Sequence, residues 1–165
     1  MLKNIIHIIF GVLFLPICIA VSLSLFDQFR NISTFSGGQL YFFYGCLAYL
    51  IIHAVVFKPE KLYVFGHEMM HAIAIVLSGG RVKAFKVSRK GGSVSSNKAN
   101  AFISLAPYFF PFYTLAVIAA YFIVSLFTDV SGLFGPFLFA IGLTLAFHII
   151  LTIDVLKIEQ TDLLG

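Results

Sequence analysis

The sequence predicts an all-α polytopic membrane protein with about five transmembrane helices and a short membrane-associated β-hairpin. Hydrophobic residues make up 60% of the 165 positions, and the mean hydropathy is +1.01. Charged residues account for only 11%, whereas a typical soluble domain has about 25%. This composition excludes a soluble nucleic-acid-binding protein, a secreted disulfide scaffold and a disordered chain, so we expect no nucleic-acid partner.

Five apolar segments are candidates for crossing a membrane, because a hydrocarbon core of about 30 Å requires roughly 20 apolar residues in a helix. They are 5–26, 40–57, 62–77, 101–127 and 133–153. The third segment is short and carries ionisable side chains near its middle. Such groups in a membrane normally face the protein interior or a wet cavity and mark function.

Two prolines interrupt the fourth segment. Pro107 and Pro111 have no backbone N–H, so the carbonyls of Ile103 and Pro107 lose their usual helical donors. Kinks of this kind are common in membrane helices and often serve only packing. A bend at this point would also open a wet pocket beside the ionisable side chains of the third segment.

The basic residues predict an orientation in the membrane. Six of the eleven Lys and Arg residues lie between positions 81 and 98, and basic residues accumulate on the cytoplasmic side. With five spans, a cytoplasmic 78–100 loop places eight basic residues inside and three outside. We therefore expect an integral, multi-pass protein of a prokaryotic cell membrane, with the 78–100 loop in the cytoplasm.

The same loop contains a predicted hairpin, 82–96. Two short segments with strand character flank the turn sequence Arg89-Lys90-Gly91-Gly92. Its basic residues predict contact with anionic lipid headgroups. An exposed strand edge around Phe85 and Val87 would bind an extended substrate by adding a strand. A solvated loop that only touches lipid is the alternative interpretation.

The string His67-Glu68-Met69-Met70-His71 points to metal chemistry. Residues four apart lie on the same face of a helix, so the two imidazoles can bind one ion. Glu68 stands beside the first ligand, where it can act as general base. This spacing is the HExxH pattern of zinc metalloproteases. We expect one Zn²⁺ per chain with His67 and His71 as ligands and Glu68 as the catalytic residue; a helix contact lined by these side chains is the structural alternative.

Further motifs follow in the order of a known family. After the HExxH string come Gly80-Arg81-Val82 and Phe85, and later Ala106-Pro107. This order resembles the site-2 protease family of intramembrane zinc metalloproteases, with a helix end at Gly, a hairpin strand with a buried aromatic, and a core helix with a small residue before Pro. The resemblance implies a protease core over 62–165 and places the two segments of 1–61 outside it.

The resemblance also implies a third zinc ligand. Gln160-Thr161-Asp162-Leu163 is similar to the family motif whose Asp binds the metal, and Asp162 lies 91 positions after His71. Asp154 is a possible alternative ligand. The chain departs from the family at two points. The Asn-Pro or Leu-Asp-Gly string that usually surrounds the metal-binding Asp is missing around Asp162, and the Asn that often follows the Pro of the core helix is missing after Pro107. His148 is therefore a possible oxyanion donor or supporting residue.

These signals predict a membrane-embedded metalloendopeptidase that hydrolyses peptide bonds in or near transmembrane segments of membrane protein substrates. A divalent-metal transporter or metal-binding membrane protein is the alternative, because ionisable groups within a membrane also line ion paths. A transporter would spread its ligands over several helices, whereas here they concentrate on one turn. A catalytically inactive protease homologue is a third interpretation.

Overall fold

The computed structural model describes residues 37–56, 58–88 and 91–157, together with scattered positions between 16 and 30. The chain divides into two compact units, Met1–Ser36 and Gly37–Gly165. In the first unit the described positions are helical. The first predicted span, 5–26, lies largely outside the described residues.

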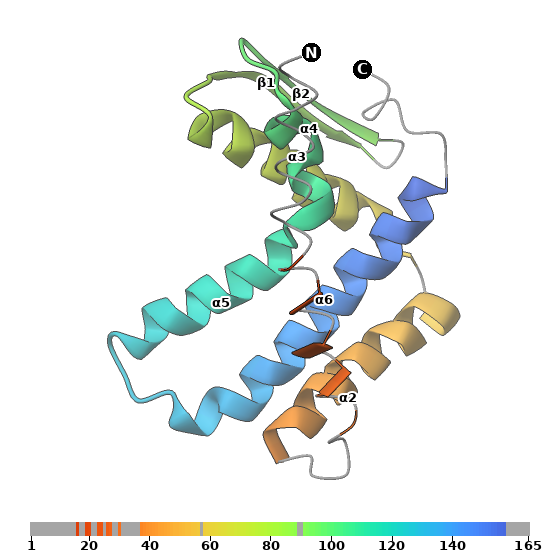
Figure 1. Cartoon of the computed structure of the whole chain (residues 1–165), viewed down its shortest axis with the longest axis vertical. Helices are drawn as coiled ribbons and strands as arrows, with labels where there is room; N and C mark the ends of the chain where they lie inside the picture. Colours follow the sequence, from red (N-terminus) through yellow and green to blue (C-terminus); the bar gives the residue numbers. More distant parts are fainter. Residues whose placement is uncertain are drawn as a thin grey trace. The chain divides into compact units, whose positions relative to one another are not determined.

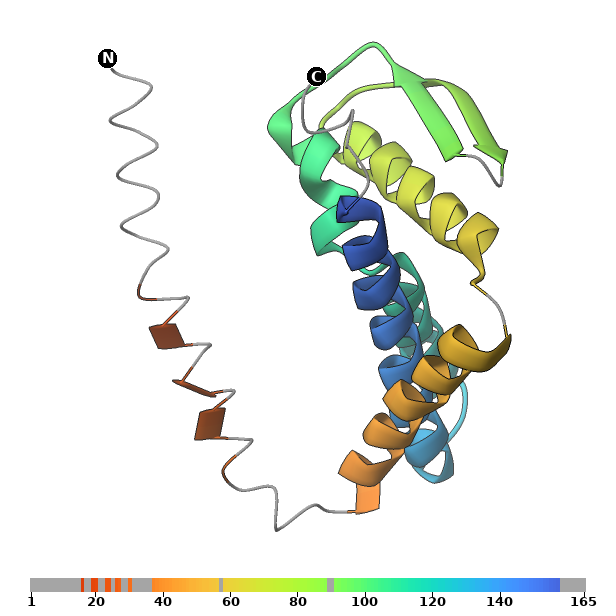
Figure 2. The same cartoon turned by 90° about the vertical axis from the view of Figure 1, so that its right-hand side faces the viewer.

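The second unit is mostly helical and contains one two-stranded antiparallel sheet (Figure 1). Helices α2 and α6 run side by side in both views, and the hairpin lies over α3 at the other end of the unit (Figures 1 and 2). The elements are α2 (Gly37–Ile51), the π-helix η2 (Ile52–Val56), α3 (Glu60–Leu77), β1 (Val82–Ser88), β2 (Gly91–Ser96), α4 (Ala101–Phe109), α5 (Phe112–Ser125), the 3₁₀ helix η3 (Ser131–Leu133) and α6 (Phe134–Leu156).

The described residues contain two helical stretches that are long and apolar enough to cross a membrane, Gly37–Val56 and Ser131–Leu156. A third span exists if the bent pair α4 and α5 is counted as one. The expected number of five is therefore not reached in the part of the chain that the structure describes. Helix α3 is not among the spans, because its 18 residues include Glu60, Lys61 and Glu68, and charged groups are costly in hydrocarbon.

The fourth predicted span is broken into α4 and α5, whose axes differ by 74°. Pro107 lies within α4, and Pro111 stands directly before α5. Neither proline can donate a backbone hydrogen bond, so the helix loses two of its internal bonds where it bends. The bend expected at these prolines is confirmed.

Two glycines follow α3 and lead into the hairpin, and the helix end expected before Gly80-Arg81-Val82 is confirmed. Gly79 has a φ of 73°, and its N–H donates to Val76 O at 2.9 Å. The N–H of Gly80 donates to Ile75 O at 2.8 Å. These two bonds satisfy the last carbonyls of the helix in the Schellman pattern, so the chain leaves α3 in a defined direction.

The predicted hairpin is confirmed, with β1 and β2 paired antiparallel. Phe85 pairs with Val94, and Val87 pairs with Gly92. Because residues directly opposite in a sheet share a face, these four positions lie on one side of the hairpin. Val94 packs against the buried cluster of α3 and α4, so this side faces α3.

Helices α2 and α6 approach so closely that side chains are excluded at two glycines. A Cβ on Gly45 would meet the backbone around Phe139, and one on Gly142 would meet the backbone of Phe42. Small residues at such crossings are typical of membrane helix pairs. A buried hydrophobic cluster from α2, α3 and α6 completes the core and comprises Tyr49, Tyr63, Ala146, Phe147 and Leu151.

Candidate metal site

The three residues of the HExxH string lie within one turn of α3. The ring centres of His67 and His71 are 4.9 Å apart, and their planes meet at 77°. The ring of His67 also packs edge to face on Tyr108 of α4, with centres 5.2 Å apart. Glu68 lies between the two histidines in sequence, and only 6% of it is exposed. The structure therefore places two neighbouring imidazoles and one buried carboxylate within one turn of α3.

A backbone carbonyl of α4 orients His71. Nδ1 of His71 lies 2.8 Å from Ile103 O. Since a carbonyl only accepts, the proton must be on Nδ1, and the lone pair is then on Nε2. Ile103 O is available because Pro107, four residues later, has no N–H to offer it. The released carbonyl that the sequence predicts thus has a specific partner in the site.

The separation of the two rings is compatible with two ligands of one zinc ion. With Zn–N bonds of about 2.0 to 2.1 Å and a tetrahedral angle, the centres of two bound imidazoles lie about 5 Å apart. The observed 4.9 Å agrees with this value. Metal-binding histidines also commonly donate their second ring N–H to a backbone carbonyl, as His71 does.

A small pocket adjoins His67 at the bend between α4 and α5. Its lining includes Pro107, Phe110 and Phe112 from the bend, together with Phe147 and His148 from α6. The pocket thus lies beside the candidate metal site, where the two prolines predict it. His148 Nε2 lies 3.4 Å from Tyr108 O, which it can reach only as a donor. The structure therefore places His148 near His67, while its role as an oxyanion donor stays a prediction.

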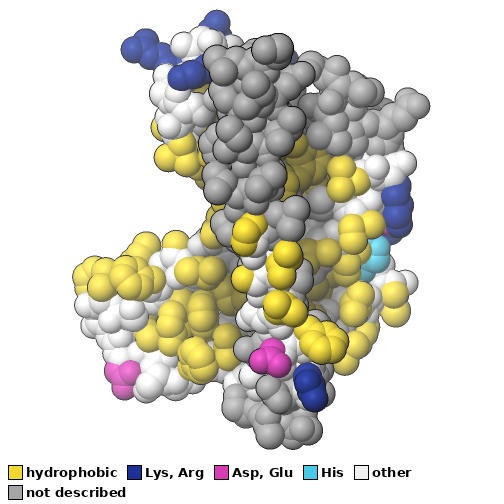
Figure 3. All heavy atoms as spheres, viewed as in Figure 1, with side chains coloured by type: hydrophobic (Ala, Val, Ile, Leu, Met, Phe, Trp, Pro, Cys, Tyr) yellow, Lys and Arg dark blue, Asp and Glu magenta, His cyan; other side chains and the backbone are white. Residues whose placement is uncertain are grey.

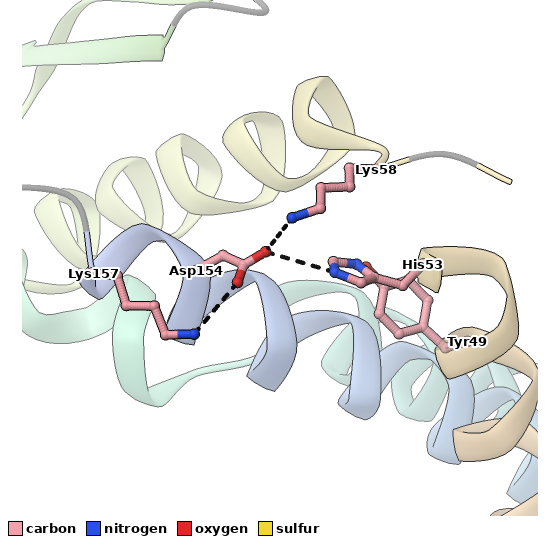
Figure 4. A network of polar contacts seen from close by, with 5 residues as sticks. All are labelled: Tyr49, His53, Lys58, Asp154 and Lys157. Atoms are coloured by element: carbon pink, nitrogen blue, oxygen red, sulfur yellow. Dashed lines mark hydrogen bonds and ion pairs between the residues drawn. The ribbon is translucent and has the colours of Figure 1, made fainter. Parts of the chain in front are cut away.

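Of the two acidic candidates for the third ligand, the structure describes only Asp154. Asp154 forms an ion pair with Lys58 at 2.9 Å and lies 3.6 Å from His53 and 4.0 Å from Lys157 (Figure 4). Asp162 lies outside the described residues. Within 37–56, 58–88 and 91–157, no group of three or more His, Cys, Asp and Glu side chains is arranged to hold a metal. The described part thus contains His67 and His71, the two ligands that the sequence predicts on α3.

The predicted substrate-binding residues lie on the side of the hairpin that faces α3. The ring of Phe85 packs edge to face on Phe65, with centres 6.1 Å apart, and Val87 is half-buried. Figure 3 shows Lys and Arg side chains gathered over the hairpin, whereas hydrophobic side chains cover α5. The described basic residues of the hairpin include Lys83 and Lys86, which are exposed.

Sequence reasoning did not identify two residues that the structure brings to this site. Tyr63 is buried one turn before His67, and its ring centre is 5.9 Å from that of His67. Its hydroxyl is 3.2 Å from Thr152 Oγ1 on α6. Gly92 of β2 lies directly on Glu68. Tyr63 could have been found from the sequence, because residues four apart share a helix face and it lies four positions before His67. The contact between Gly92 and Glu68 could not, because it depends on how the hairpin folds back over α3.

Comparisons with protein-family models, curated proteins and solved structures give no match for this chain.

Proposed function

We propose that this chain is a membrane-embedded zinc metalloprotease that hydrolyses peptide bonds in or near the transmembrane segments of membrane proteins. The observation that carries the proposal is the paired arrangement of His67 and His71, with His71 oriented by Ile103 O at 2.8 Å. The apolar helices that could span a membrane suit a substrate that is itself in the bilayer.

In this proposal His67, His71 and Asp162 hold the zinc. When bound, the ion would lower the pKa of a water molecule and polarise the scissile carbonyl. Glu68 takes a proton from the attacking water and passes it to the leaving amine. Its burial on α3, with 6% exposed, keeps the carboxylate out of bulk water.

The hairpin provides a route for an extended substrate. The sheet has two strands, so among the described residues each strand has one edge with no neighbouring strand. A substrate segment that adds to such an edge becomes extended, and its peptide carbonyls are then exposed to the site. The exposed lysines of the hairpin would hold it against anionic lipid headgroups on the cytoplasmic face.

The test is cleavage of a model transmembrane substrate by purified protein, comparing Glu68→Gln with Glu60→Gln. The amide keeps the shape of Glu68 but cannot accept the proton of water. We expect a loss on the order of 10²-fold or more with unchanged zinc content. Glu60 is exposed in the first turn of the same helix, so Glu60→Gln should cleave like the wild type.

Two results would argue against the proposal. Cleavage near the wild-type rate in Glu68→Gln would remove Glu68 as general base. Stoichiometric zinc in a wild-type protein that cleaves no membrane substrate would favour a metal-binding or transport function instead.

A further inference from the structure

The hairpin contains two adjacent glycines, and only the first needs to be glycine for its backbone conformation. Gly91 has a φ of 137°, a region that residues with side chains rarely adopt, and a Cβ there would have open space around it. Gly92 has no such φ. Any residue could adopt the backbone conformation of Gly92. The reason for a glycine at this position must therefore lie in the atoms around it.

The surroundings of Gly92 are the side chain of Glu68. An ideal Cβ at position 92 would lie 2.7 Å from Oε1 and 2.8 Å from Cδ of Glu68, and closer still to Cγ. Carbon atoms do not approach one another so closely, so a side chain at this position would force one partner to move. The backbone of β2 therefore rests on the candidate general base.

Neither partner has much freedom to move away. Glu68 projects from the middle of α3 and is only 6% exposed. On the other side, Val94 lies two residues after Gly92 on the same face of β2 and packs against the cluster of Ala74, Ile75 and Ile103. This anchor holds β2 on α3 beside the contact.

We propose that Gly92 is a positioning residue of the candidate site, because the missing side chain lets β2 close directly over Glu68. The contact limits the conformations of the carboxylate and keeps it in place beside His67 and His71. A side chain at position 92 would hold the strand away and leave the carboxylate less ordered. The inference rests on the proposed role of Glu68 in peptide hydrolysis, but the contact itself can be tested without that activity.

The first experiment is a double-mutant cycle measured by thermal unfolding of the full chain in detergent. Gly92→Ala in the wild-type background should lower the unfolding midpoint by about 5 °C, the size expected for a forced contact. In the Glu68→Ala background the same change should shift the midpoint by less than about 1 °C, because the clashing atoms are gone.

Two variants serve as matched controls. Glu68→Gln keeps the size of the side chain, so Gly92→Ala should cost as much in that background as in the wild type. Gly132→Ala adds a methyl group where no atom lies within 4 Å, and its small effect should be the same in every background. If Gly92→Ala alone does not accumulate, recovery of folded protein in the double variant with Glu68→Ala supports the proposal.

The second experiment measures turnover of the model substrate at constant zinc content. Gly92→Ala should lower kcat on the order of 10- to 100-fold, the usual effect of misplacing a reacting group by about 1 Å. Zinc content and KM should stay near the wild-type values, and Gly92→Val should lower kcat further. A purely structural role for Gly92 would reduce the folded fraction without changing kcat per folded molecule.

The outcomes separate this inference from the proposed function. An equal loss of stability from Gly92→Ala in the wild-type and Glu68→Ala backgrounds would overturn the inference, as would a double variant that still fails to fold. Unchanged kcat in Gly92→Ala would also overturn it. Coupling between the two positions in a protein that neither binds zinc nor cleaves would support the contact and refute the protease.

Discussion

The α2–α6 pair and the unit formed by α3, the hairpin and α4 are held together by different contacts. In the pair, Gly45 and Gly142 let two apolar helices touch through their backbones. Around α3, the hairpin and α4 share an apolar cluster with that helix, and polar contacts are added to it, such as His71 with Ile103 O and Asn100 with Ser78. Backbone packing between apolar helices tolerates little change in shape, whereas polar contacts fix individual side chains.

We infer from this difference that the α2–α6 pair mainly stabilises the fold, whereas α3, the hairpin and α4 carry the proposed zinc site. The residues proposed to act on substrate lie on α3, and the groups that orient them come from α4 and β2. Changes in the α2–α6 pair should therefore alter stability and leave zinc binding intact. Changes around α3 should alter zinc binding or turnover more than stability. The following predictions test this separation, in order of decreasing effect.

Gly142→Ala should destabilise the protein by about 3 kcal/mol, the upper part of the range for overpacking. The new methyl group would meet the backbone of Phe42, which cannot move aside. Thermal unfolding in detergent measures the loss, and the zinc content of the remaining folded protein should be unchanged. The nearest atoms to a Cβ at Gly135, on the same helix, belong to the side-chain ring of Tyr41, so Gly135→Ala should cost less. A loss of zinc at unchanged stability in Gly142→Ala would contradict the separation.

Pro107→Ala should weaken zinc binding about 10- to 100-fold without destabilising the fold. The new N–H would compete with His71 for Ile103 O, while the helix gains a hydrogen bond. Competition with a chelator measures the zinc affinity. Pro111→Ala is the control, because its N–H would bond the carbonyl of residue 107 and leave Ile103 O to His71. Equal zinc affinities in the two variants would show that the Ile103 contact does not support the site.

Asp154→Asn should have the smallest effect, about 0 to 1 kcal/mol of stability. Its side chain is 30% exposed and that of Lys58 is 50% exposed, so water and salt screen their ion pair. Asp154 forms ion pairs with Lys58, Lys157 and His53, which we call the Asp154 cluster. Because this is its structural role, Asp154→Asn should leave the zinc content unchanged, and Lys58→Ala should cause the same small loss of stability. Loss of zinc in Asp154→Asn alone would instead make Asp154 the third ligand.

Local signals in the sequence predict much of the region around α3. The HExxH spacing, the glycines after Leu77 and the turn at Gly91 each depend on residues within a few positions. Pro107 likewise predicts the release of the carbonyl four residues earlier. Such features follow from backbone chemistry and need no knowledge of the rest of the fold.

Contacts between distant segments could not be predicted in this way. Lys58 and Asp154 are 96 positions apart, and nothing near either residue indicates the other. Gly92 meets Glu68 only because the hairpin folds back over α3. The angle of 74° between α4 and α5 also depends on packing, because the two prolines predict a kink but not its size. Tertiary packing decides each of these points.

Zinc bound per chain in purified protein tests the central claim most directly. Elemental analysis should find one zinc in the wild type, and far less in His67→Ala and in His71→Ala, because each change removes one ligand. His53→Ala, which alters a histidine of the Asp154 cluster, should retain the full amount. Absence of stoichiometric zinc in the wild type, or zinc that survives His71→Ala, would contradict the account.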